Sequence, residues 1–440
     1  MRYLVLIIFF LFVVSCSIGK ELSSLETEPE ILKIIYSSNL DGELEPCGCT
    51  IEGDLGGIQR RVTVIDQYRE QSPELILISG GGLLDTYFGE AHIKNNYILK
   101  GLGLLSYDAI GVQWRDLAFG TQLLGNSNLP FVSSNYPTDN FVRSKLIVRN
   151  NIEVNFFSLL DPTMYPLMHD KEKFDDFTSS LTKQLKAAKK KQQITLLTTT
   201  APETWLVEHV GLSYVDILVK PLKREEYKEP TFIGGTIVLH PGARGMRLGS
   251  AVVSIKKNEV DVIKHEILEL SAKIPEPSRM SDWYKRYNED VKKNFERVTL
   301  LDSQAEAEGQ FYLGQGTCKT CHSAIADKLA STKHSHAYAS LQRVDKAFDP
   351  ECVECHVVGF NKPGGFISSA HTPHLADVQC ENCHGNAAEK SSQLHSSNPF
   401  ENKQGLVKHS PQEVCQQCHN HNHSPSFEFK EYWPKIMHPK

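Results

Sequence analysis

Cysteine and histidine are concentrated near the C-terminal end of this sequence, in a pentapeptide, Cys-x-x-Cys-His, that occurs four times. The copies are Cys318–His322, Cys352–His356, Cys380–His384 and Cys415–His419. In this pattern two thiols can form thioethers with the vinyl groups of a porphyrin, and the adjacent histidine can bind its iron. We therefore predict four covalently attached haem c groups, one at each copy.

The pentapeptides define two sets of predicted ligands. The attachment residues are Cys318, Cys321, Cys352, Cys355, Cys380, Cys383, Cys415 and Cys418. The proximal iron ligands are His322, His356, His384 and His419. Nine further histidines follow residue 310, whereas Met437 is the only methionine there. We therefore expect histidine on both sides of most of the irons.

Composition sets limits on the rest of the chain. Its 440 residues are enough for two or three domains, and a net charge of −6 gives no indication of a nucleic-acid partner. Eight of the 11 cysteines and 13 of the 18 histidines follow residue 310. This asymmetry predicts a cofactor-rich domain at residues 311–440, joined to a domain of a different kind.

The N-terminus has the features of an export signal. Arg2 precedes an apolar run from Tyr3 to Val14 that is too short to cross a bilayer comfortably. The following Ser15-Cys16 completes a resemblance to a bacterial lipobox, in which the cysteine is lipidated; ordinary cleavage near Ser15 is the alternative. We predict a lipoprotein signal peptide at 1–16, a tether at 17–30, and attachment through Cys16 to the periplasmic or outer-surface face of a membrane.

Between residues 31 and 270, short apolar runs alternate with helical patterns. Strands are predicted at Ile31–Tyr36, Leu75–Ser79, Ala109–Val112, Ile194–Thr198, Val215–Val219, Thr231–Leu239 and Ser250–Ile255. Helices are predicted at Ile58–Glu70, His92–Leu105 and Lys171–Lys191. This alternation is typical of a layered α/β fold, and the closely spaced later strands indicate a mixed sheet.

The order of these signatures resembles the metallophosphoesterase domain of the 5′-nucleotidase family. Ile34–Gly42 stands where that family has its first strand and an Asp-x-His ligand pair. Leu75–Gly82 corresponds to a strand ending in Gly-Asp, and Tyr107–Asp116 to the segment leading into Gly-Asn-His-Glu. Phe131–Asn135 resembles the next strand with its terminal asparagine, and Gly235–Gly249 resembles the closing region. The resemblance implies a phosphoesterase-like scaffold.

Most of the metal ligands that this resemblance implies are absent. The corresponding positions read Asn39, Asp41, Gly82, Trp114, Arg115, Lys220 and Pro221. Hydrolysis by two metals needs those ligands to polarise the phosphoryl group and activate water, and arginine or glycine cannot replace them. We expect a domain that has lost its metals, in which His209 and His240 are structural residues.

One loop of this domain could still do chemistry. Glu45-Pro46-Cys47-Gly48-Cys49 follows the first predicted strand, where α/β folds place functional loops. Cys47 and Cys49 could form an easily reduced disulfide, a reactive thiol pair or part of a metal site. An inert disulfide that fixes the loop is the alternative, and the spacing does not decide between them.

A connector is predicted between the two domains, at residues 271–310. Pro275 and Pro277 interrupt the strand pattern, and Trp283, Tyr287, Val291 and Phe295 then recur at helical spacing. We predict a bridging helix there, with no site of its own.

The C-terminal domain resembles the tetrahaem cytochrome c family that includes the electron acceptor of hydroxylamine oxidation. The resemblance rests on Thr332–Ala339, Val357–Phe360, Val378–Gly385, Ser424–Phe427 and Tyr432–His438. It implies a mostly helical and irregular fold around the haems. It also implies His334, His395 and His438 as distal ligands, with His374 or His371 as a fourth and one haem open in some members.

Two main functions follow from these patterns. The first is an exported, lipid-anchored tetrahaem cytochrome that carries electrons between redox partner proteins. The alternative is an oxidoreductase that reacts at a five-coordinate haem or at the Cys47/Cys49 loop. A residual nucleotidase is a third hypothesis, which the missing ligands oppose.

Overall fold

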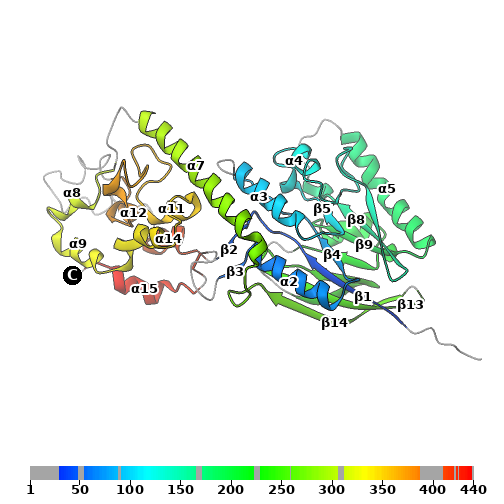
Figure 1. Cartoon of the computed structure of the whole chain (residues 1–440). Coiled ribbons are helices and arrows are strands. Elements are labelled where there is room, and N and C mark those ends of the chain that lie inside the picture. Colours follow the sequence, from blue (N-terminus) through cyan, green and yellow to red (C-terminus); the bar gives the residue numbers. More distant parts are fainter. Residues whose placement is uncertain are drawn as a thin grey trace, which may run out of the picture.

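The computed structural model describes residues 29–47, 54–87, 91–164, 171–221, 228–257, 259–305, 312–386, 410–420, 423–424 and 426–438. Figure 1 shows an elongated molecule with an α/β region at one end and short helices at the other. The long helix α7 (Ser281–Ala305) runs from one region to the other. The predicted fold class is confirmed: a layered α/β domain is followed by a helical and irregular domain.

Two six-stranded mixed sheets form the α/β domain. The first has the order β14 (Glu259–Glu269), β13 (Arg247–Lys256), β1 (Glu30–Ser37), β4 (Ile76–Ser79), β5 (Ala109–Gly111) and β6 (Phe131–Val132). The second has the order β11 (Lys228–Ile233), β12 (Thr236–His240), β10 (Ile217–Val219), β9 (Ile194–Thr199), β8 (Ile152–Leu159) and β7 (Ser144–Arg149). Strands β1, β4, β5 and β6 are mutually parallel, so their C-terminal ends meet at one edge.

Side-chain alternation along the strands produces four layers. Leu32, Ile34 and Tyr36 of β1 belong to the apolar cluster between the two sheets, whereas Ile35 belongs to the cluster beneath the outer helices. That outer cluster includes residues of α2 (Ile58–Gln71), α3 (Ala91–Gly103) and α7. Helices α5 (Lys171–Lys190) and α6 (Glu203–His209) cover the second sheet. The result is an α–β–β–α arrangement.

The three predicted helices and most predicted strands of this domain are present within a few residues of their expected bounds. The single strand predicted at Thr231–Leu239 is wrong, because Gly234 and Gly235 turn the chain between β11 and β12. Gly234 has φ +61°, a conformation that glycine adopts without a steric clash because it has no Cβ atom. The β7–β8 hairpin and β14 were missed, although Asn150 and Asn151, both with positive φ, form a turn of a kind typical of hairpins.

The bridging helix is present as α7. Its Trp283 donates a hydrogen bond to the carbonyl of Tyr97 in α3 at 3.1 Å. At its other end Phe295 stacks on Phe360 of the C-terminal domain, with ring centroids 6.3 Å apart. Helix α7 therefore packs against both domains.

The described residues of the C-terminal domain form little polypeptide core of their own. Its helices are α8 (Gln315–Lys319), α9 (Ser323–Ala330), α10 (Ala337–Arg343), α11 (Pro350–His356), α12 (Cys380–His384), α14 (Pro411–Cys418) and α15 (Phe429–Ile436). One small apolar cluster includes Tyr338, Val353, Val357 and Leu375. All residues of α8, α14 and α15 are described, and none of them is buried.

Among the residues described, no helix is both long and apolar enough to cross a bilayer.

Candidate haem centres and the neighbouring α/β edge

Each pentapeptide lies on a short helix or at its end. Three of these helices begin with a clear N-cap: Asp349 accepts from the Glu351 N–H ahead of α11, and capping boxes start α12 and α14. Cysteines three residues apart and the histidine that follows lie on the same face of a helix. In the second and third copies, which lie wholly on helices, the local fold therefore directs both thiols and the imidazole to one side.

The thiols of different pentapeptides are neighbours. Cys318 of the first copy neighbours Cys380 of the third, and Cys355 of the second neighbours Cys418 of the fourth. The third and fourth copies are close through Cys383 and Cys415, and α12 contacts both α8 and α14. The four attachment sites therefore form a continuous series in the order first, third, fourth, second.

Two pairs of imidazoles face each other in this domain. The ring centroids of His334 and His419 are 6.0 Å apart, and those of His384 and His438 are 5.6 Å apart. Two imidazoles bound to opposite sides of one metal, at ~2 Å each, have centroids roughly 6 Å apart. Burial lowers the pKa of both His334 and His419, which favours the neutral ring that a metal requires. The donor set thus fits a haem iron between each pair.

The second proximal histidine is held in a defined tautomer. Nδ1 of His356 lies 2.7 Å from the carbonyl oxygen of Ala337. Because a carbonyl only accepts, Nδ1 is the protonated nitrogen, and the Nε2 lone pair is available for a metal. Among the described histidines, no ring contact pairs His356 with a second imidazole.

The remaining candidate residues are two exposed histidines and two residues outside the described part of the chain. His374 is exposed and lies beside Gly314, at the start of the first attachment helix, rather than at the second. His371 is exposed and hydrogen-bonds Ser368 at 2.8 Å. His395 and the predicted lipidation residue Cys16 lie outside the described residues. The ligand assignments therefore stay predictions.

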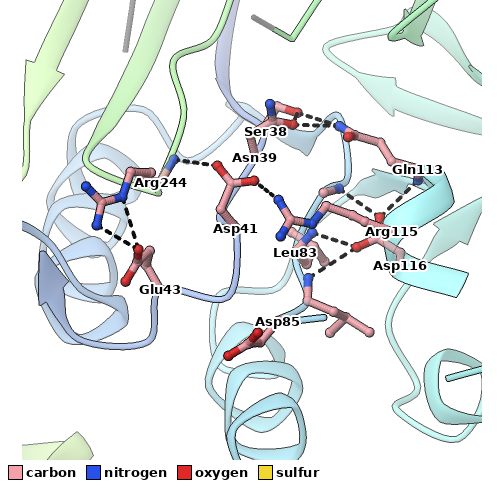
Figure 2. Close-up of polar contacts among 12 residues, drawn as sticks. Ser38, Asn39, Asp41, Glu43, Leu83, Asp85, Gln113, Arg115, Asp116 and Arg244 are labelled. Atoms are coloured by element: carbon pink, nitrogen blue, oxygen red, sulfur yellow. Dashed lines mark hydrogen bonds and ion pairs between the residues drawn. The ribbon is translucent and has the colours of Figure 1, made fainter. Parts of the chain in front are cut away.

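The edge of the first sheet carries the positions that resemble phosphoesterase metal ligands (Figure 2). Gln113 donates from Nε2 to Asn39 Oδ1 at 2.8 Å, and the same nitrogen lies 3.1 Å from both Ser38 Oγ and the Gly80 carbonyl. A Cβ added to Gly82 would lie 2.6 Å from Asn39 Oδ1 and 2.9 Å from Gln113 Oε1. The space into which an aspartate at 82 would project is therefore filled by these two amides.

Arginine side chains compensate the carboxylates of this edge. Arg115 forms an ion pair with Asp41, whose other oxygen accepts from the Arg244 N–H at 3.0 Å. The guanidinium of Arg244 pairs with Glu43 at 2.9 Å. Burial raises the pKa of Asp41, and the Arg115 charge opposes that shift. The positive charge at this edge is thus supplied by side chains.

Asp116 was not singled out from the sequence, yet it organises the loops of this edge. Its fully buried carboxylate accepts from the backbone N–H groups of Gly82, Leu83, Leu84 and Gln113, at 2.7, 2.6, 3.3 and 2.9 Å. Burial raises its pKa, and the four donors oppose the shift. A single aspartate in a short 3-10 helix gave no sequence signal for this role.

The two histidines predicted to be structural have ordinary partners. His240 hydrogen-bonds Thr231 at 2.9 Å, and His209 stacks on Trp205 with centroids 4.6 Å apart. In the part of the chain that the structure describes, no group of three or more histidine, cysteine, aspartate or glutamate side chains is placed to hold a metal ion.

The start of the thiol loop, at Glu45, lies beside the C-terminal domain. Cys47 is in the short strand β2 (Pro46–Cys47), which pairs with β3 (Leu55–Gly56); Cys49 lies outside the described residues. Two residues before Cys47, Glu45 forms an ion pair of 2.7 Å with Lys346 of the C-terminal domain. Sequence reasoning missed this contact, because isolated charged residues carry no pattern.

Several solved structures have a similar fold. A 5′-nucleotidase precursor from Thermus thermophilus is 16% identical, with 65% of this chain and 61% of that chain covered and a TM-score of 0.49. A calcineurin-like phosphoesterase from Bacillus subtilis is 15% identical, with 60% of this chain and 98% of that chain covered and a TM-score of 0.44. These similarities concern the fold alone and assign no chemistry to the α/β domain.

The C-terminal domain is similar to known cytochromes in sequence. The family model described as "Cytochrome c554 and c-prime" matches residues 317–385, which contain the first three pentapeptides. Cytochrome c-554 of Nitrosomonas europaea is 34% identical over 102 residues, or 20% of this chain and 43% of that protein. The chain thus spans less than half of that relative's length. These matches confirm the predicted resemblance of the C-terminal domain to a c-type cytochrome family.

Proposed function

We propose that this protein is an exported, lipid-anchored cytochrome with four haem c groups that carries electrons between redox partner proteins. One observation carries the proposal: four helix-borne Cys-x-x-Cys-His segments form a continuous series, and two pairs of imidazoles lie at iron-spanning distance beside them. When bound, haem c supplies a one-electron couple whose potential depends on its axial ligands and surroundings.

The chain's own residues would hold and orient the groups. The eight cysteines of the pentapeptides would anchor them, and His322, His356, His384 and His419 would bind from the proximal side. His334 would be the distal partner of His419, and His438 that of His384. His395 and His374 stay candidates for the remaining distal positions. Filled axial positions favour electron transfer over binding of a substrate at iron.

The axial pairs can be tested by substitution in the holoprotein. Native protein should contain four haems per chain by the pyridine haemochrome assay, with mainly low-spin c-type absorption bands. His334→Ala or His438→Ala should each convert one of the four haems to a high-spin form, because one axial ligand is lost.

His209→Ala is the control, since this histidine lies in the α/β domain, where its ring stacks on Trp205, and its loss should not affect the spectrum. A native spectrum dominated by high-spin haem would contradict the electron-carrier proposal. Low-spin spectra that persist in both ligand variants would contradict the assigned pairs.

Export and anchoring are proposed from Cys16 and the apolar run that precedes it. Covalent haem attachment is expected to take place after export, which agrees with this proposal. Native protein should sediment with membranes, and Cys16→Ser should release it or leave it uncleaved, as cell fractionation and intact mass would reveal. Equal membrane retention with a normally processed N-terminus in the variant would argue against the lipid anchor.

We also propose that the α/β domain does not bind the two metal ions of phosphoesterases, because Arg115 supplies the positive charge that balances Asp41. Arg115→Met should lower the free energy of unfolding of this domain by about 1–3 kcal/mol at pH 7, less than for a fully buried pair since both side chains are partly exposed. Burial raises the pKa of Asp41, so the loss should shrink as pH falls through that pKa and the carboxyl becomes neutral. Urea unfolding followed by circular dichroism at several pH values would measure it.

Arg279→Met is the control, because its pair with Asp66 is about half exposed and should change stability little. Binding of two equivalents of Zn²⁺ or Mn²⁺ by the native α/β domain, measured by calorimetry, would contradict the metal-free assignment.

A second candidate function is an oxidoreductase that reacts at the Cys47/Cys49 loop or at a five-coordinate haem of the second pentapeptide. The ion pair of Glu45 with Lys346 favours it, because it holds the start of the loop close to α11. Under this candidate the Cys47→Ser/Cys49→Ser variant should keep four haems and lose turnover. Unchanged turnover in the double variant would exclude the loop as the reacting centre.

A further inference from the structure

A short segment directly before the second pentapeptide packs against the α/β domain. We call residues 346–351 the docking segment; Cys352 follows it at once. Its Phe348 is 7% exposed and belongs to the same apolar cluster as Tyr287 and Val291 of α7. That cluster also contains residues of α2 and α3, so an aromatic side chain of the C-terminal domain completes the outer core of the other domain.

The ammonium group of Lys346 is enclosed by groups from both domains. Its Nζ lies 2.7 Å from Glu45 and 3.3 Å from Asp349, and it donates to Asn288 Oδ1 at 2.8 Å. The side chains of Lys346 and Asp349 are only 15% and 8% exposed. Burial alone would lower the pKa of Lys346, but Glu45 and Asp349 outweigh it and raise that pKa. The lysine therefore stays charged and paired.

A second ion pair joins the same segment to α3. Lys94 pairs with Glu351, in the first turn of α11, and lies 3.5 Å from Asp85. Asp349 in turn caps α11 by accepting from the Glu351 N–H at 3.2 Å. The first turn of α11 is therefore held by Phe348 and by two lysine–carboxylate pairs that cross the interface.

We propose that the α/β domain is the positioning platform for α11, the helix of the second pentapeptide. The docking segment contacts the loop after β1, helix α3 and helix α7. These contacts fix the direction of α11 and thus of Cys352, Cys355 and His356. An apolar anchor flanked by charged residues is common at the centre of protein interfaces, and here both lysines are largely buried. Removing the partner of such a lysine would leave a largely buried charge without compensation, so loss of either pair should be destabilising.

Positioning of α11 is a role for the α/β domain that requires no metal ion. This proposal rests on the proposed function only in that α11 carries a haem. The platform residues are positioning residues: none of them is a predicted attachment residue or iron ligand.

Lys346→Met in the full haem-loaded chain is the direct test. Hydrogen–deuterium exchange should be roughly tenfold faster or more for the backbone amides of α11, and unchanged for those of α8. One of the four midpoint potentials should also move. At fixed potential we expect about a tenfold change in the ratio of reduced to oxidised haem at that site, equal to ~59 mV for a one-electron couple.

Matched variants guard against a simple folding defect. Lys285→Met is the control, because this lysine of α7 is 75% exposed and lies 4.0 Å from Glu289. Glu45→Gln weakens the same ion pair less severely. It should also make hydrogen–deuterium exchange of α11 faster, by a smaller factor. Its effect should be less than additive with Lys346→Met, because both remove one interaction.

Haem content separates this inference from the proposed function. Fewer than four haems in the native chain would overturn the proposed function, whereas exchange of α11 can be measured at any haem content. Unchanged exchange of α11 in both Lys346→Met and Phe348→Ala would overturn the positioning role. Faster exchange of α11 and α8 alike would also overturn it, because the effect would not be local to the docked helix.

Discussion

The described part of the C-terminal domain has few buried apolar side chains for a conventional core. A small cluster around Tyr338, Val353 and Leu375 is buried there, and α8, α14 and α15 contribute no buried residue. A domain of this kind needs another source of apolar contact. Under the proposed function, porphyrins attached to cysteines on closely spaced helices would supply it, and attachment would then be a condition for folding as well. The neighbouring thiols of helices that are not consecutive in the chain agree with this compact packing.

At the edge of its first sheet, the α/β domain has partly buried carboxylates whose charge must be compensated. Carboxylates there need positive charge nearby, which two metal ions provide in the phosphoesterases that the sequence resembles. Here Arg115 and Arg244 provide it for Asp41 and Glu43, while Asn39 and Gln113 fill the space beside Gly82. The loops keep their shape because Asp116 accepts four backbone hydrogen bonds. These side chains therefore balance one another's charge and hydrogen-bonding needs at this edge.

The two domains meet through a small number of buried contacts. Phe348 supplies apolar area, and Lys346 and Lys94 supply charge pairs that cross the interface. Helix α7 packs against both sides and extends the contact through Phe295 and Phe360. Because these contacts converge just before Cys352, the arrangement of the domains and the placement of the second attachment helix are physically linked.

The sequence by itself determined the chemistry of the C-terminal domain and most of the α/β elements. Attachment of haem depends on a local pattern of two cysteines and a histidine, and strands such as β1 and helices such as α2 follow from local apolar periodicity. It also indicated that metal ligands are missing, since Gly82 and Arg115 can be read directly. Only the tertiary structure decided which distant residues meet. The pairing of His334 with His419, the four bonds to Asp116 and the enclosure of Lys346 all join residues far apart in the chain. Single histidines, aspartates and lysines carry no periodic signal, because their partners are set by how elements pack rather than by neighbouring residues. For the same reason the contact between the two domains, centred on Phe348 and Lys346, was decided by the fold alone.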